Sequence, residues 1–182
     1  MARSDKTYVT ADELLERIRE GRAALTALWA GLTEEQMMCR PGPQENWSVK
    51  DLVAHITWWE AFILERVTDL ISGAPSEPAE DTDILNARVY AQHRDRPLAE
   101  VLAAFDANWP QLKALISSLD DEQLNRPAYY RTYDGVALLP ILGAGTFHHY
   151  PSHMADLRAY VERLRISLRG LGGSRIADGC CG

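Results

Sequence analysis

The sequence predicts an all-α protein, an antiparallel four-helix bundle with an extra short helix and long connections. Four long segments repeat apolar residues at intervals of three and four, the period of a helix with one buried face. No stretch of any length shows the alternation of apolar and polar residues that is typical of a strand. Amphipathic helices joined by such connections bury their apolar faces against one another as a bundle.

The first helix is expected over residues 10–32, TADELLERIREGRAALTALWAGL. Thr10 and Glu13 have the spacing of a capping box at its start. The segment that follows contains Pro-Gly-Pro at residues 41–43, which breaks the helical pattern. We therefore expect residues 33–46 to be a connection with one helical turn at its start.

The second helix is expected over residues 48–73 and has the strongest pattern in the chain. Ser48 is a favourable N-cap, with Asp51 at the third helical position. Gly73 is placed to end the helix in a left-handed conformation. His55 lies one turn from apolar residues on both sides, so we expect it at the border of the buried face.

Two further helices are expected after an acidic, proline-containing linker. Residues 83–95, DILNARVYAQHRD, predict the extra short helix, and Pro97 is suited to the start of a long helix over residues 98–119. Pro110 is expected to bend that long helix. A loop follows, and the last element is expected as one helix over residues 136–168, which contains three of the five histidines.

The domain organisation follows from the length and from the composition of the C-terminus. The 182 residues suffice for one full hydrophobic core, so we expect a single domain over residues 1–170 and a glycine-rich tail over residues 171–182. Three cysteines do not make a disulfide framework. Cys180 and Cys181 are neighbours in the tail, and their role stays open.

The charge and hydropathy of the chain exclude several classes of partner. Twenty-six acidic side chains outweigh nineteen basic ones, which gives a net charge of −7. Nucleic-acid-binding proteins present a basic stripe, and this sequence has none, so we expect no nucleic-acid partner. The apolar runs are shorter than the roughly 20 residues of a membrane-spanning helix, and the first residues lack the apolar core of a secretory signal. We therefore expect a cytoplasmic protein with no membrane partner.

The histidines are the strongest candidates for chemistry. His149 and His153 are four residues apart, a spacing that brings two side chains to one face of a helix. Two ligands hold a metal ion poorly, and His55 is the available third ligand from a facing helix. The alternative is that each histidine is a hydrogen-bonded core residue. His148 points about 100° away from His149, and Pro151 counts against a regular helix at this point.

Three segments resemble a known family. WSVKDLVAHITWWE resembles the second-helix signature of the DinB-like four-helix bundle superfamily. DTDILNARVYAQHRDRPLAEVLAAF and GTFHHYPSH resemble the corresponding segments of its ClbS/DfsB branch, and together the matches extend over residues 10–168. The resemblance implies a divalent metal, zinc or nickel, held by His55, His149 and His153.

Three neutral imidazoles leave a coordination position open, which suits a catalytic site. The first hypothesis is therefore a metal-dependent hydrolase or thiol-type transferase that acts on a small electrophilic molecule, as in resistance or detoxification. The second is a binding or protective module without metal. The third is a helical interaction protein, a homodimer that buries an exposed apolar stripe.

Aromatic residues near the predicted site are candidates for a substrate pocket, and their alternative role is core packing. They are Trp58, Trp59, Tyr90 and Tyr150. Glu60 is a candidate general base or one half of an ion pair with a surface charge such as Arg66. Asp51 and Asp156 are candidates to hold the second ring nitrogen of a ligand histidine, or are surface charges.

Overall fold

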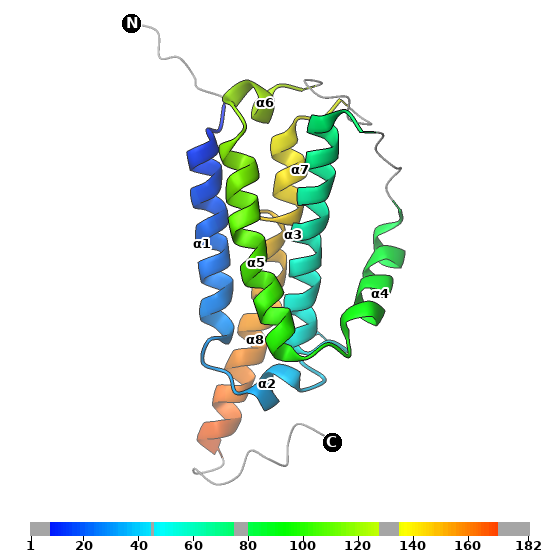
Figure 1. Ribbon diagram of the computed structural model, residues 1–182. Coiled ribbons are helices and arrows are strands. Elements are labelled where there is room, and N and C mark those ends of the chain that lie inside the picture. The colour runs from blue at the N-terminus through cyan, green and yellow to red at the C-terminus, as the bar shows by residue number, and fades with distance from the viewer. Residues whose placement is uncertain (1–7, 45, 75–79, 128–134, 171–182) are drawn as a thin grey trace, which may run out of the picture.

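The computed structural model describes residues 8–44, 46–74, 80–127 and 135–170 of the chain, and its helices are arranged as a bundle (Figure 1). No strand occurs among these residues, which confirms the all-α class. The helices are α1 (Ala11–Trp29), α2 (Glu34–Met38), α3 (Val49–Ser72), α4 (Thr82–His93), α5 (Leu98–Ser117), α6 (Asp121–Asn125), α7 (Leu138–Gly145) and α8 (His149–Gly170).

The helix ends follow the predicted capping residues. Thr10 and Glu13 form the capping box of α1. The Ser48 side chain accepts a hydrogen bond from the Asp51 backbone at the start of α3, and Gly73 ends α3 with a φ of 74°. α5 continues through Pro110 to Ser117. These local signals therefore place α1, α3 and α5 where the sequence predicted them.

The order of the helices in space differs from a strictly antiparallel bundle. The chain returns along the outside of α3 as α4, so α3 and α5 start at the same end and run in the same direction (Figure 1). Two contacts fix this arrangement: Lys50 Nζ donates to the Arg96 carbonyl at 3.2 Å, and Asn108 Nδ2 donates to the Thr57 carbonyl at 2.8 Å. The extra helix is thus the crossover that makes two bundle helices parallel.

The fourth position in the bundle is occupied by two helices where the sequence predicted one. α7 ends at Gly145, and α8 begins at His149. Between them the backbone of Thr146 leaves the helical region, with φ −131° and ψ −111°. A Cβ at Gly145 would lie 2.3 Å from Ile63 Cγ1, so glycine lets this junction approach α3 closely. The break therefore positions the first turn of α8 directly against α3.

The apolar faces of these helices meet in one core that extends along the bundle. No helix in the described part of the chain is long and apolar enough to cross a membrane. The predicted tail, with Cys180 and Cys181, lies outside the described residues.

Candidate metal centre

His55 lies on α3 and points into the bundle. Its side chain is 5% exposed, because α3 turns this face towards the other helices of the bundle. The sequence predicted that His55 borders the buried face, and the structure places it within that face.

His149 and His153 lie one turn apart at the start of α8. Pro151 falls within that first turn, where backbone N–H groups have no partner inside the helix, so the missing N–H of proline costs no helical hydrogen bond. The proline that counted against a regular helix is therefore accommodated by the break before His149. Both histidines are half-buried, and His148 is exposed.

The three rings converge through their Nε2 atoms. His149 Nε2 lies 3.1 Å from His55 Nε2 and 2.9 Å from His153 Nε2. One ligand atom from each residue can be chosen so that all three lie within 4.8 Å of one another. We call His55, His149 and His153 the histidine cluster. The structure thus brings together the three residues that the sequence singled out.

The contacts within the histidine cluster cannot all be hydrogen bonds. Nε2 of a neutral imidazole carries either one proton or one lone pair, so His149 Nε2 can form a hydrogen bond with only one of its two neighbours. The three Nδ1 atoms are buried and have no hydrogen-bond partner among the described residues. Ligands about 2.0–2.1 Å from a shared ion lie about 3 Å apart, so this donor set fits a divalent cation.

The protonation state also suits metal binding. Burial, together with repulsion from the other two rings, lowers the pKa of His55 to about 3. Burial and His153 lower the pKa of His149 to about 3, and burial lowers the pKa of His153 against a smaller opposing effect of Asp156. All three rings are therefore neutral near pH 7 and can offer a lone pair to a cation.

Aromatic rings surround the histidine cluster. The Trp59 ring lies 6.3 Å from His55 and 6.0 Å from His149, measured between ring centroids. The Trp47 ring lies 5.0 Å from His55 and stacks on Tyr90 at 5.5 Å. Trp47 was not among the predicted site residues, although it stands directly before the cap of α3, in the segment that carries the family resemblance.

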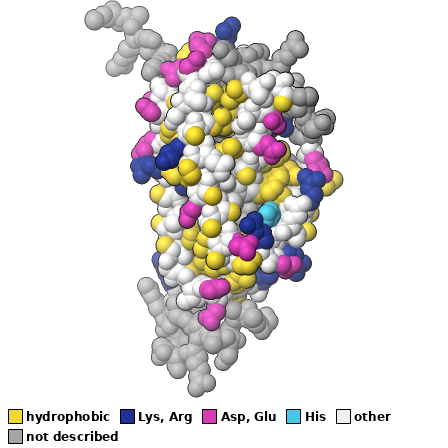
Figure 2. Space-filling view, in the orientation of Figure 1, with side chains coloured by type: hydrophobic (Ala, Val, Ile, Leu, Met, Phe, Trp, Pro, Cys, Tyr) yellow, Lys and Arg dark blue, Asp and Glu magenta, His cyan; other side chains and the backbone are white. Residues whose placement is uncertain are grey.

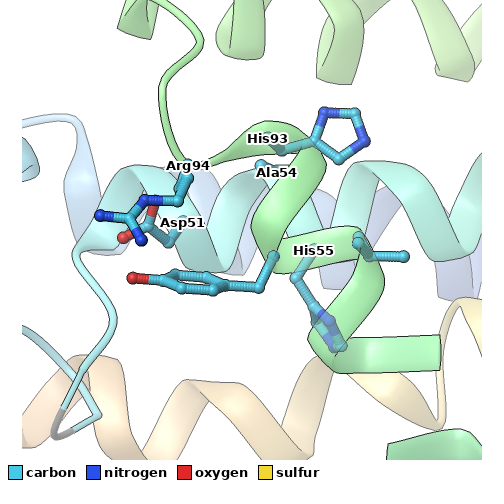
Figure 3. Close-up of a pocket in the computed structure, with 7 residues that line it drawn as sticks. Asp51, Ala54, His55, His93 and Arg94 are labelled. Carbon is cyan, nitrogen blue, oxygen red and sulfur yellow. The ribbon is translucent and has the colours of Figure 1, made fainter. Parts of the chain in front are cut away.

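A small cavity lies between α3 and α4, and His55 forms part of its wall (Figure 3). It is a narrow gap with essentially no room for a water molecule. The ring of His93, which was expected to be solvated, is directed away from that of His55 (Figure 3). The lining residues are Asp51, Ala54, His55, Val89, Tyr90, His93 and Arg94. Of the predicted pocket residues, Tyr90 therefore lies at this cavity.

Two of the predicted pocket residues have other surroundings. Tyr150 is fully buried, and its hydroxyl donates to Glu60 Oε1 at 2.6 Å, so the prediction that it faces a substrate pocket is wrong. Its position next to His149 turns its side chain about 100° from that of His149 around the helix axis. Trp58 stacks on Phe62 and meets the edge of Trp59.

The charged candidates are also explained by their partners. Glu60 is fully buried and pairs with Arg22 of α1, so it is not paired with a surface charge. Asp51 is buried, accepts a hydrogen bond from the Ser48 backbone N–H in the capping box of α3, and accepts two more from Arg40. Asp156 accepts a hydrogen bond from Gln44 at 3.3 Å. Neither aspartate bonds to Nδ1 of a ligand histidine.

The sequence matches the model of the DinB superfamily over residues 17–157. The chain belongs to the DinB superfamily. This confirms the family that the sequence motifs indicated. No curated protein matches the sequence.

Solved structures share the fold at low sequence identity. An uncharacterised protein from Escherichia coli UTI89 has a TM-score of 0.77 at 17% identity, over 86% of this chain and 95% of that one. DfsB, described as a sibling lethal factor precursor, has a TM-score of 0.74 at 18% identity, over 87% of this chain and 98% of that one. The colibactin self-resistance protein ClbS, solved with a double-stranded DNA, has a TM-score of 0.70 at 21% identity, over 83% of this chain and 94% of that one. At this identity the likeness establishes the fold.

Proposed function

We propose that the protein is a divalent-metal-dependent hydrolase or thiol-type transferase that acts on a small electrophilic molecule. The observation that carries this proposal is the convergence of three Nε2 atoms from α3 and α8. Three histidines form an open ligand set of the kind found in catalytic sites, whereas structural zinc sites are closed by four protein ligands.

The residues of this chain would have distinct roles. His55, His149 and His153 would hold zinc or nickel, because imidazole suits both metals. The ion would supply Lewis-acid activation of a water or of a thiol at its open position. Trp47 and Trp59 would screen one side of the site from bulk water, while the half-buried His149 and His153 leave another side accessible.

A role in resistance or detoxification agrees with the membership of the DinB superfamily and with the fold shared with ClbS, which is described as a self-resistance protein. The DNA in that structure belongs to ClbS. Here the net charge is −7, and on the face shown in Figure 2 the Lys and Arg side chains are dispersed among acidic ones. We therefore propose a small molecule as the substrate.

The test is turnover of an activated epoxide and of an aryl ester by zinc- or nickel-loaded protein, with and without an added low-molecular-weight thiol. A hydrolase consumes a substrate without the thiol, and a transferase requires it. In either case His153→Ala should lower the rate about a hundredfold or more. Turnover of equal rate in wild type, His153→Ala and chelator-treated protein would contradict a metal-dependent reaction.

A further inference from the structure

Tyr150 occupies an unusual place in the sequence, between two of the three predicted metal ligands. Its side chain is fully buried on the side of α8 that faces α1 and α3. The ring packs against α1 at Gly21, where a Cβ would lie 2.5 Å from Tyr150 Cδ2. Its hydroxyl donates to Glu60 Oε1 at 2.6 Å. Ring and hydroxyl are therefore both held by other helices.

The acceptor of this hydrogen bond is itself fixed from two further helices. Arg22 of α1 donates to both carboxylate oxygens of Glu60, and Asn108 Nδ2 of α5 donates to Glu60 Oε2 at 3.2 Å. Arg22 is held in turn by the Phe105 carbonyl, to which its Nη2 donates at 2.6 Å. The hydroxyl of Tyr150 thus binds to a point that α1, α3 and α5 hold together.

The first turn of α8 depends on such an anchor. The helix is broken at Thr146, and the backbone N–H groups of His149 and Tyr150 both donate to the carbonyl of that same residue. Pro151 has no backbone N–H, so the backbone ties this turn only to the residue at the break. Neighbouring side chains on a helix are about 100° apart. Fixing the direction of Tyr150 therefore fixes the direction of His149, and of His153 one turn later.

We propose that Tyr150 is a positioning residue of the metal centre, which sets the rotation of the first turn of α8 so that His149 and His153 face His55. This inference rests on the proposed metal site. It assigns a role at that site to a side chain that does not touch the ion.

The chain offers a matched control on the same helix. Tyr160 is also buried, and its hydroxyl donates to the Gln36 carbonyl at 2.6 Å. It lies about 10 Å along the helix from His153. Tyr150→Phe and Tyr160→Phe each remove one hydroxyl and one hydrogen bond from α8, but only the first lies beside the ligands.

The experiment is titration of metal-free wild type, Tyr150→Phe and Tyr160→Phe with Co²⁺ and with Zn²⁺. The visible bands of bound Co²⁺ report the geometry of its ligands, which a loss of stability alone does not change. We expect Tyr150→Phe to bind about tenfold more weakly and to have altered Co²⁺ bands, and Tyr160→Phe to match wild type. Gly21→Ala, which keeps the hydroxyl and displaces the ring, should change the bands in the same way.

The outcomes separate this inference from the proposed function. If wild type binds neither ion, both are overturned. If wild type binds and Tyr150→Phe has the same affinity and bands, the metal site stands and the role of Tyr150 is overturned. Equal weakening by Tyr150→Phe and Tyr160→Phe would also overturn it, because that result indicates a general loosening of α8.

Discussion

The bundle contains a second buried polar cluster besides the histidine cluster. We call it the Glu60 cluster, and it consists of Arg22, Glu60, Asn108 and Tyr150. The two clusters differ in how their polar atoms are satisfied. In the Glu60 cluster the carboxylate accepts hydrogen bonds from three side chains. In the histidine cluster three Nδ1 atoms are buried without a partner, the only such side-chain atoms among the described residues.

This difference separates a structural cluster from a candidate functional one. A buried polar group costs free energy unless a partner satisfies it. The Glu60 cluster meets this requirement within the chain, so it can stabilise the folded protein without any ligand. The histidine cluster does not, because its three Nδ1 atoms have no partner in the part of the chain that the structure describes. Its Nε2 atoms also crowd one point, where a cation would accept all three lone pairs at once. The predictions below test this contrast.

The largest effect is expected from breaking the Glu60 cluster. Arg22→Met removes the guanidinium and leaves a buried carboxylate, which should lower the free energy of unfolding by about 3–5 kcal/mol. Urea denaturation at pH 7 measures this change. The control is Arg19→Met, which removes an exposed pair with Glu16 and should cause no measurable change. An Arg22→Met variant as stable as wild type would contradict the claim that the Glu60 cluster stabilises the fold.

The histidine cluster predicts a dependence of stability on pH in the metal-free protein. The pKa of His55 and of His149 is about 3 when folded, against an ordinary value of 6.5. Because the folded pKa is depressed, the unfolded chain binds more protons below pH 6.5, and stability is lost as the pH falls. For each of these two residues, the free energy of unfolding should fall by about 2 kcal/mol between pH 7 and pH 5.

Denaturation of chelator-treated protein at several pH values measures that loss. Protein reloaded with zinc should lose less over the same range, because bound metal keeps the rings deprotonated. Equal stability of the metal-free protein at pH 7 and pH 5 would show that the three rings are not buried together as described.

The smallest effect on stability is expected when one histidine of the cluster is replaced by an apolar residue. His153→Leu removes a half-buried ring whose Nδ1 has no partner among the described residues and whose Nε2 lies 2.9 Å from His149 Nε2. Its free energy of unfolding should change by less than about 1 kcal/mol, in either direction. A loss similar to that of Arg22→Met would mean that the histidines hold the fold together as the Glu60 cluster does.

The histidine cluster could be predicted from sequence because its signals are local. Spacing of four residues places His149 and His153 on one face, and the apolar pattern of residues 48–73 turns His55 inward. Helix caps are local too, so the starts of α1 and α3 were predicted correctly. The family resemblance then indicated that the two faces meet.

The misassigned features depend on contacts between distant parts of the chain. Glu60 pairs with Arg22, 38 residues earlier, and no spacing rule connects the two. Tyr150 lies beside His149 in sequence, yet its burial against Gly21 is a property of how α1 and α8 pack. The break at Thr146 lies where Gly145 approaches α3 closely, a contact between helices that the local sequence pattern does not show.

The most direct test of the metal centre is the metal content of protein purified without an affinity tag. We expect about one equivalent of divalent metal per chain in wild type and in the Arg19→Met control, and less than about a tenth of that in a folded His153→Ala variant. Elemental analysis and circular dichroism on the same samples give both quantities. Folded wild-type protein that contains no metal, and takes up none on dialysis against zinc or nickel, would contradict the account.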